Sequence, residues 1–268
     1  TTIAKAVYYK ICKTFQGSSI LEGVREASEE RKGLIKLQRQ LLSDILRKKI
    51  QFSNVNEGKA LIERRFRALK VLIILDDVDK IGQVEALAGG IDWFGLGSKV
   101  IITTRDEHVL NLHQVNGIYK PKELEFNQSL QLFSNNAFRR DQPLDCFMNL
   151  AENIVCTIGG LPLALEVLGC FLFDKERPKE WESTLEKLKK IPPKEIQEKL
   201  KISYESLDDL EKDLFLHIAC FFIGTEMEYA NDILESCELC STIGMKVLIQ
   251  KSLLKIDNKN KIRIHDLL

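Results

Sequence analysis

The sequence predicts an α/β domain with a parallel sheet, followed by a small helical bundle and by helices closed with a two-stranded hairpin. Helical patterns and unbroken apolar strands alternate over about the first 120 residues, which is typical of a parallel sheet covered by helices. After Tyr119 the strand signals stop and helical periodicity takes over. Two short strand-like segments come last. The predicted domain boundaries are 1–120, 121–192 and 193–268.

Four elements are predicted before the first buried strand. Apolar residues recur four positions apart over Thr1–Phe15 and indicate an opening amphipathic helix. Ser18–Val24 is apolar enough for a short strand. A second amphipathic helix is predicted over Leu34–Ile45 and a third over Glu57–Leu69. This order places one strand between helices, as an α/β layer requires.

Two further strands end in polar residues. The apolar run Lys70–Leu75 leads into Asp76-Asp77, and Gly97–Ile102 leads into Thr103-Thr104-Arg105. Unbroken apolar runs of this length are typical of parallel strands buried on both faces. The carboxyl ends of parallel strands meet at one edge of a sheet, where α/β proteins bind their ligands. The polar residues are therefore expected to lie together.

The rest of the chain reads as helices with one break and one hairpin. Ile191-Pro192-Pro193 cannot continue a helix and is predicted to link two parts. The final strands are joined by Asp257–Asn260, so this part reads as a winged helix. The predicted elements in chain order are helices over Ser129–Phe138, Cys146–Ile158, Pro162–Phe173, Trp181–Lys189, Lys194–Ser203, Asp208–Ile223, Tyr229–Glu235 and Ile243–Gln250, and strands over Leu253–Ile256 and Lys261–Ile264.

Composition limits the class of protein. The chain has 268 residues, 44% of them hydrophobic, with 39 Lys or Arg and 39 Asp or Glu, so no global field attracts nucleic acid or anionic lipid. No apolar run approaches the roughly 20 residues that span a bilayer. Seven cysteines, mostly inside apolar runs, favour reduced thiols in the cytoplasm or nucleus. Cys237 and Cys240 lack the second pair of ligands that a zinc site needs.

Thr1-Thr2 and Asp76-Asp77 are candidates for phosphate and metal chemistry. A P-loop wraps backbone N–H groups around phosphates and ends in Lys followed by Ser or Thr, whose hydroxyl reaches Mg²⁺ as a helix begins. Thr1-Thr2 matches that end, although Thr at a helix start is also a common N-cap. Asp76 would bind Mg²⁺, partly through water, and Asp77 would orient or deprotonate an attacking water. The alternative for both aspartates is a solvated strand end.

Arg105 completes the candidate site. Its planar guanidinium at the end of a strand could contact a γ-phosphate, the alternative being an ordinary surface arginine. The order Thr-Thr, strand-Asp-Asp, strand-Thr-Thr-Arg within one α/β unit predicts a nucleotide site. Asp76 and Asp77 are the candidate catalytic residues, and Thr1 and Asp76 the candidate metal ligands.

Six segments together resemble the NB-ARC domain of plant disease-resistance proteins, in the STAND group of P-loop NTPases. The resemblance covers the whole chain and rests on Phe15–Glu26, Val71–Asp79, Gly97–Asp106, Gly159–Leu165, Phe215–Phe222 and Ile264–Leu268. Asp79, where the coiled-coil-bearing subgroup usually has Trp, and the Gly17–Glu22 stretch are similar to the TIR-bearing subgroup. The resemblance implies an α/β nucleotide-binding domain, a helical first ARC subdomain and a winged-helix second one.

The resemblance also implies roles for single residues. Thr1 would be the Mg²⁺-side Thr of the loop, Thr2 would lie by the phosphates, and Pro162 would contact the adenine. Without the family, Pro162 is an N1 proline that starts a helix. His265 would contact the β-phosphate of ADP and hold the inactive state, with Ile264 in the place of the family's Met and of similar bulk.

The function implied is an immune-receptor switch with an ADP-bound resting state and an ATP-bound active state, reset by slow hydrolysis. By resemblance TIR and leucine-rich-repeat domains flank this region, and activation involves self-association. The chain begins inside the loop, so residues 1–268 alone are expected to bind ADP poorly and to lack activity. A turnover ATPase is the alternative. A winged-helix DNA reader is disfavoured, because residues 195–268 hold nine Lys or Arg and fourteen Asp or Glu.

Overall fold

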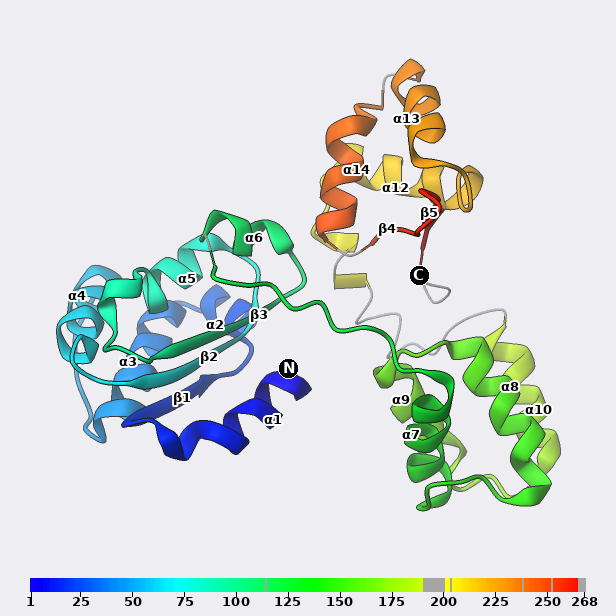
Figure 1. Ribbon diagram of the computed structural model, residues 1–268, viewed down its shortest axis with the longest axis horizontal. Coiled ribbons are helices and arrows are strands. Elements are labelled where there is room, and N and C mark those ends of the chain that lie inside the picture. The colour runs from blue at the N-terminus through cyan, green and yellow to red at the C-terminus, as the bar shows by residue number, and fades with distance from the viewer. Residues whose placement is uncertain (114, 190–200, 203, 238, 252, 265–268) are drawn as a thin grey trace. The chain divides into compact units, whose positions relative to one another are not determined.

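The structure is a computed structural model that describes residues 1–113, 115–189, 201–202, 204–237, 239–251 and 253–264. It divides into two compact units, Thr1–Ile118 and Tyr119–Leu268 (Figure 1). The predicted linker at Ile191–Pro193 and most of the predicted helix over Lys194–Ser203 lie outside the described residues. Within the described part, no helix combines the length and apolarity needed to cross a membrane.

The first unit is built on a three-stranded parallel sheet. Its strands are β1 (Gly17–Leu21), β2 (Val71–Val78) and β3 (Lys99–Thr104), in the order β1-β2-β3. β2 is central and almost fully buried, which explains its unbroken apolar run. β3 is at the edge, and its side chains are at best half-buried. The expected parallel sheet is therefore present.

Six helices and two 3₁₀ turns accompany this sheet in the described part of the unit. Packing of α3 against β1, and of α2 and α5 against β2, forms the main apolar core of the unit. The segments are α1 (Thr2–Ile11), a 3₁₀ turn at Cys12–Thr14, α2 (Val24–Glu29), α3 (Gly33–Leu46), α4 (Val55–Phe66), α5 (Ile81–Ala88), a 3₁₀ turn at Ile91–Trp93 and α6 (Glu107–Leu112).

Element boundaries in the first unit differ from the expected ones for local reasons. β1 ends at Leu21 instead of Val24, because Gly23 adopts a left-handed φ of 58° and Val24 begins α2. α4 begins after Asn54, whose side chain accepts a hydrogen bond of 2.9 Å from the Glu57 N–H. The short helices α2, α5 and α6 were not predicted, since six to eight residues give too little periodicity.

The carboxyl end of β2 contains a bulge. Leu75 pairs with Ile102 and Val78 pairs with Thr104, so β2 has one more residue than β3 in this interval. The extra residue is accommodated at Asp77, which has a φ of 57°. Asp tolerates this left-handed conformation better than most residues with a side chain. The bulge therefore sets the directions of the two carboxylates at this strand end.

A buried glutamine in α3 joins this helix to α4 and α5. Gln38 is fully buried in α3 and its amide donates to the carbonyls of Val55, at 3.0 Å, and Ala86, at 2.8 Å. Its Oε1 lies beside Gly58, where an added Cβ would be 2.1 Å away. Only glycine lets α4 approach the amide this closely.

The second unit contains two apolar cores. One is centred on Trp181, whose ring lies 4.8 to 5.9 Å from those of Phe147, Phe138 and Phe133. The Trp181 Nε1 donates to the Lys175 carbonyl at 2.9 Å, so the buried indole is satisfied. The other core gathers apolar residues of the last three helices and of the hairpin that closes the chain. Helices closed by a hairpin are the expected winged-helix pattern.

The helices and strands of the second unit match most of the predicted positions. The described elements are α7 (Phe126–Phe138), a 3₁₀ turn at Asp145–Phe147, α8 (Met148–Ile158), α9 (Pro162–Leu172), α10 (Pro178–Leu188), α12 (Asp209–Phe221), α13 (Met227–Ser236), α14 (Ser241–Gln250), β4 (Lys255–Ile256) and β5 (Ile262–Arg263), the last two antiparallel.

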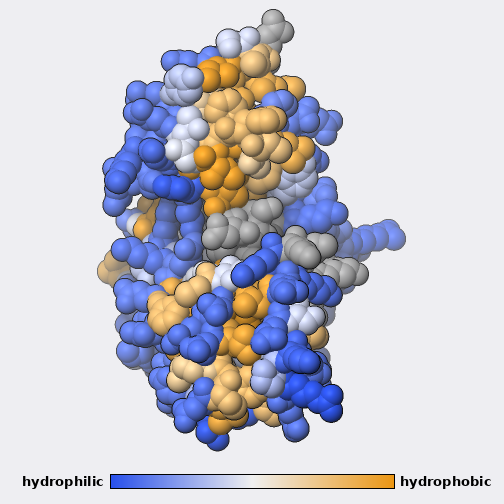
Figure 2. Space-filling view, turned by 90° about the vertical axis from the view of Figure 1, so that its right-hand side faces the viewer, coloured by the Kyte–Doolittle hydropathy of each residue, from blue (hydrophilic) through white to orange (hydrophobic). Residues whose placement is uncertain are grey.

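Several apolar and sulfur-containing side chains lie outside the cores. The face drawn in Figure 2 carries apolar side chains among hydrophilic ones. Six of the seven cysteines are exposed. They lie in α8, α9 and α12, in the 3₁₀ turn before α8, and between α13 and α14. Among the described residues, no three His, Cys, Asp or Glu side chains cluster as a metal site would require.

Candidate functional site

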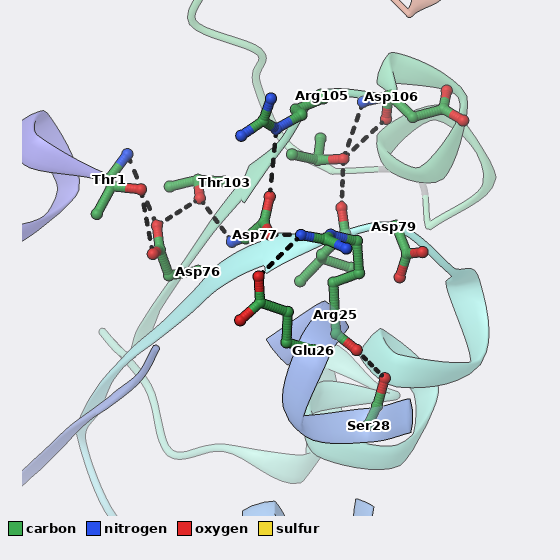
Figure 3. Close-up of polar contacts among 12 residues, drawn as sticks. Thr1, Arg25, Glu26, Ser28, Asp76, Asp77, Asp79, Thr103, Arg105 and Asp106 are labelled. Carbon is green, nitrogen blue, oxygen red and sulfur yellow. Dashed lines mark hydrogen bonds and ion pairs between the residues drawn. The ribbon is translucent and has the colours of Figure 1, made fainter. Parts of the chain in front are cut away.

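Four segments of the first unit meet at the carboxyl edge of the sheet (Figure 3). β2 contributes Asp76 and Asp77, and the end of β3 contributes Thr103 and then Arg105. Thr1 precedes α1, and Arg25 is the second residue of α2. The strand-end rule for parallel sheets thus brings together residues that are far apart in the sequence.

Asp76 is a buried carboxylate with a hydroxyl on each oxygen. Its residue is only 6% exposed. The Thr1 hydroxyl donates to Oδ2 at 3.1 Å, and the Thr103 hydroxyl donates to Oδ1 at 2.7 Å. A buried charge needs such partners, because burial without them is strongly unfavourable. The carboxylate is therefore held in one orientation, facing the start of α1.

The Thr1 hydroxyl is not used as a helix cap. Thr1 occupies the N-cap position of α1, yet its side chain makes no capping hydrogen bond and contacts Asp76 instead. The simple N-cap interpretation of Thr1 is therefore wrong. Thr2 is the first residue of α1 and is exposed. The structure places Thr1, but not the Thr2 side chain, in contact with the acidic strand end.

Thr103 connects the two aspartates. Its hydroxyl donates to Asp76 and accepts the Asp77 backbone N–H at 2.9 Å. A hydroxyl has one donor and two acceptor sites, so both bonds are compatible. Because Asp77 is in the bulge, its N–H would otherwise lack a regular strand partner. Thr103 therefore fixes both the carboxylate and the bulge.

The Asp77 carboxylate lies between two guanidinium groups. Arg25 Nε donates to Oδ2 at 3.1 Å, and Arg105 Nε is 3.5 Å from Oδ1. The Arg25 side chain is 20% exposed and that of Arg105 is 42% exposed. Burial alone lowers the pKa of Arg25, but the charge and hydrogen bond of Asp77 more than offset this, so the pKa is raised. Arg25 is therefore firmly cationic beside Asp77.

A second ion pair borders the site. Lys5 Nζ in α1 is 2.8 Å from a carboxylate oxygen of Glu22, the residue after β1. The hydrogen bond to Glu22 is the main cause of the raised pKa of Lys5, and the charge of Asp76 adds to it. This edge of the sheet thus alternates acidic and basic groups.

The donor set at Thr1 and Asp76 fits Mg²⁺. This ion prefers hard oxygen ligands and is usually bound through one or two carboxylates, with water and substrate phosphates completing the octahedron. A hydroxyl at a helix start beside a buried strand-end aspartate is the combination that P-loop proteins use for it. The Thr1 hydroxyl lies 3.1 Å from Asp76 Oδ2, so the two oxygen donors are adjacent at this edge of the sheet.

The remaining predicted residues lie elsewhere or outside the described part. Pro162 is the exposed first residue of α9 in the second unit. His265 and Asp266 are outside the described residues. The prediction missed two residues, Thr103 and Arg25. Thr103 is near the end of β3, so the rule that identified Asp76 and Arg105 also covers it. Arg25 lies in α2, beyond the end of β1, and the strand-end rule does not reach it.

Two protein-family models match the chain, one in its first half and one in its last part. The model of the NB-ARC domain family matches residues 1–143. The chain belongs to the NB-ARC family. A second family model, described as the winged-helix domain of Roq1-like disease resistance proteins, matches residues 208–268. The predicted family and the predicted winged helix are confirmed.

Relatives of this NB-ARC chain are plant disease resistance proteins. It is 40% identical over 272 residues to TMV resistance protein N of Nicotiana glutinosa, and 42% identical over 270 residues to disease resistance protein RUN1 of Vitis rotundifolia. All of the chain is covered in both cases, but only 24% and 20% of the two relatives. The chain therefore spans about a quarter or less of the length of these relatives.

A solved structure supports the fold class. A Walker-type ATPase of Pyrococcus abyssi matches with a TM-score of 0.57 at 14% identity, covering 94% of this chain and 82% of that one. At this identity the likeness concerns the fold alone. Together with the NB-ARC match it confirms the P-loop NTPase fold and implies that the chain binds a nucleotide.

Proposed function

We propose that this NB-ARC chain is the ADP/ATP switch of a plant immune receptor, resting with ADP and active with ATP. The observation that carries the proposal is the network in which Thr1 and Thr103 hold the buried Asp76 carboxylate while Arg105 lies beside Asp77. Its relatives are disease resistance proteins, which supports the immune role. The parent receptor would act in the cytoplasm or nucleus, with flanking TIR and leucine-rich-repeat domains and self-association on activation.

Each residue of the network has a distinct task. Thr1 and Asp76 would bind Mg²⁺, which neutralises charge on the β- and γ-phosphates when bound. Asp77 would orient a water, and Arg105 would contact the terminal phosphate. Thr2 would lie by the phosphates, Pro162 by the adenine, and His265 by the β-phosphate of ADP. Thr103 keeps Asp76 and Asp77 in their positions.

The environment of Asp77 favours a slow switch over a turnover ATPase. Both of its carboxylate oxygens already have a guanidinium partner, Arg25 on one and Arg105 on the other. A general base must offer a free lone pair to the water that it deprotonates. Two cationic partners compete for those lone pairs, so hydrolysis is expected to be slow. The ATP-bound active state would then persist long enough to signal before it is reset.

The test uses a chain that carries a complete phosphate-binding loop ahead of Thr1. Calorimetry with Mg²⁺ and with a chelator measures ATP and ADP binding to the parent, to Asp76→Asn and to the exposed control Asp92→Asn. Asp76→Asn is expected to lose at least about tenfold in Mg²⁺-dependent ATP affinity, as changes at metal ligands and their supports typically do. The Asp92 control should match the parent.

Two results would overturn the proposal. A parent chain that binds neither nucleotide would not be a nucleotide switch. Rapid hydrolysis over many turnovers would instead identify a turnover ATPase, since a switch must keep its nucleotide for long periods. Single-turnover and multiple-turnover assays on the same preparation separate these cases.

A further inference from the structure

Arg25 is more buried than Arg105 at the strand ends, and the proposed function uses it only as a partner of the Asp77 carboxylate. It is the second residue of α2, and its Nε donates to Asp77 Oδ2 at 3.1 Å. Its Nη2 reaches the exposed Glu26 carboxylate at 3.2 Å. The guanidinium thus points inward to the bulge of β2 with one nitrogen and outward with another (Figure 3).

The backbone that carries Arg25 is fastened to the segment after Asp77. The Ser28 hydroxyl donates to the Arg25 carbonyl at 2.9 Å and accepts from Gln83 Nε2 at 2.7 Å. Gln83 is only 3% exposed and also donates to Asp79 Oδ1 at 2.7 Å. This chain of hydrogen bonds runs from α2 to α5 and to the end of β2. Arg25 therefore approaches Asp77 from a fixed direction.

The two arginines contact different oxygens of one carboxylate. Arg25 makes the shorter contact and is the less exposed, whereas Arg105 at 3.5 Å is the longer and more exposed contact. Arginine and carboxylate prefer to form two parallel hydrogen bonds when nothing else competes. If Arg25 were absent, Arg105 could rotate into such a bidentate pair with Asp77. It would then have to break this pair to contact a phosphate.

We infer that Arg25 is a positioning residue that selects ATP over ADP by holding Asp77 so that Arg105 can turn to a terminal phosphate. The inference rests on the proposed function, because it assumes that Arg105 contacts the γ-phosphate. ADP has no γ-phosphate, so ADP affinity does not depend on this arrangement. Arg25 thus sets the ratio of the two affinities and leaves the affinity for ADP unchanged.

The experiment compares variants that separate charge from packing. Met and Lys have similar length, so Arg25→Met and Arg25→Lys both keep the side-chain stem while only the second keeps the charge. Arg31→Met is the matched control, since Arg31 lies just after α2 and is exposed. Each variant is made in the chain with the complete phosphate-binding loop, and calorimetry measures the dissociation constants of Mg²⁺-ATP and ADP. Thermal unfolding checks that each variant is folded.

Arg25→Met is expected to weaken ATP binding on the order of tenfold and to leave ADP binding within about twofold, the scale of one hydrogen bond to a charged group. Arg25→Lys and Arg31→Met are expected to keep the parent ratio within about twofold. In an Arg105→Met background, Arg25→Met should have no further effect on the ratio. If Arg25→Met does not fold, Arg25→Gln, which keeps a polar end at the surface, replaces it with the same expected outcome.

Contrary results have separate meanings. Equal weakening of ATP and ADP by Arg25→Met, or equal effects of Lys and Met, would show that Arg25 is only a structural cross-link and would overturn the inference. A loss of ATP preference that persists in the Arg105→Met background would overturn it too. A parent chain that binds neither nucleotide overturns the proposed function and this inference with it. Tight binding of both nucleotides by the parent, with an unchanged ratio in Arg25→Met, overturns the inference alone.

Discussion

Thr103→Val tests the hydrogen-bond network of the candidate site, because the Thr103 hydroxyl links Asp76 to Asp77. The two side chains have nearly the same shape, so the substitution removes the hydroxyl and little else. It deletes the hydrogen bond to Asp76 Oδ1, at 2.7 Å, and leaves the Asp77 N–H without its acceptor at 2.9 Å. A hydrogen bond to a charged group contributes about 1.5–3 kcal/mol, and an unsatisfied buried donor costs about 1–3 kcal/mol. Because both hydrogen bonds involve the same hydroxyl, we expect the free energy of unfolding to fall by about 2–4 kcal/mol in total.

Fluorescence can follow this loss in the first unit alone. The chain has two tryptophans, Trp93 in the first unit and Trp181 in the second. In a Trp181→Phe background, urea unfolding monitored at Trp93 reports the stability of the first unit. Thr103→Ser keeps the hydroxyl and serves as the control, with an expected change below about 1 kcal/mol. If Thr103→Val costs less than about 0.5 kcal/mol, or no more than Thr103→Ser, the hydroxyl does not hold the site together and the reasoning fails.

Two further predictions concern other parts of the chain. Gly58→Ala is expected to lower the free energy of unfolding by about 1–3 kcal/mol, because the new Cβ would lie 2.1 Å from the buried Gln38 amide oxygen. Gly82→Ala is the control, because a Cβ there would have nothing within 4 Å, and it should be neutral or stabilising by up to about 1 kcal/mol. Urea unfolding measures both free energies. The pKa of Asp257 is lowered chiefly by the Lys261 N–H that its carboxylate accepts. A lowered pKa means that the ionised form stabilises the hairpin above the ordinary value of 3.8 and that this contribution disappears as the pH falls through the folded pKa. The Lys261 amide signal in NMR should therefore report hairpin opening in acid, and Asp257→Asn should abolish that pH dependence; an amide signal that titrates alike in both proteins would contradict the assignment.

Much of the site follows from a simple rule about parallel sheets. The apolar runs that end in Asp76 and in Thr103 predicted two neighbouring strands whose polar ends would meet, and the structure pairs them as β2 and β3. Thr1 and Asp76 were predicted as ligands of one Mg²⁺, and the structure places the Thr1 hydroxyl 3.1 Å from Asp76 Oδ2. These features depend on strand direction and burial, which a single sequence encodes well.

The bulge at Asp77 could not be predicted in the same way. Asp76 and Asp77 read as two alternating residues of a regular strand, whereas the structure inserts one residue there and gives Asp77 a φ of 57°. The conformation depends on the Thr103 hydroxyl that receives the Asp77 N–H, which is a partner on another strand. Local propensity carries no information about such a partner.

The exposure of the cysteines also lies beyond what composition can predict. Cys156 and Cys220 stand within apolar runs of the sequence, yet they are exposed on amphipathic helices. Composition counts the neighbours of a residue along the chain, whereas burial depends on its angular position around the helix. A position-by-position reading of periodicity would have separated the two.

The exposed position of β3 has a practical consequence for anyone who prepares residues 1–268. β3 lies at the edge of the sheet and contains Val100, Ile101 and Ile102 in a half-buried row, with Lys99 as its single charged residue. An edge with open backbone groups and β-branched side chains is a template for pairing with another chain. Preparations of these residues should therefore become turbid as the protein concentration rises. A lysine in place of Ile101 should delay that loss of soluble material.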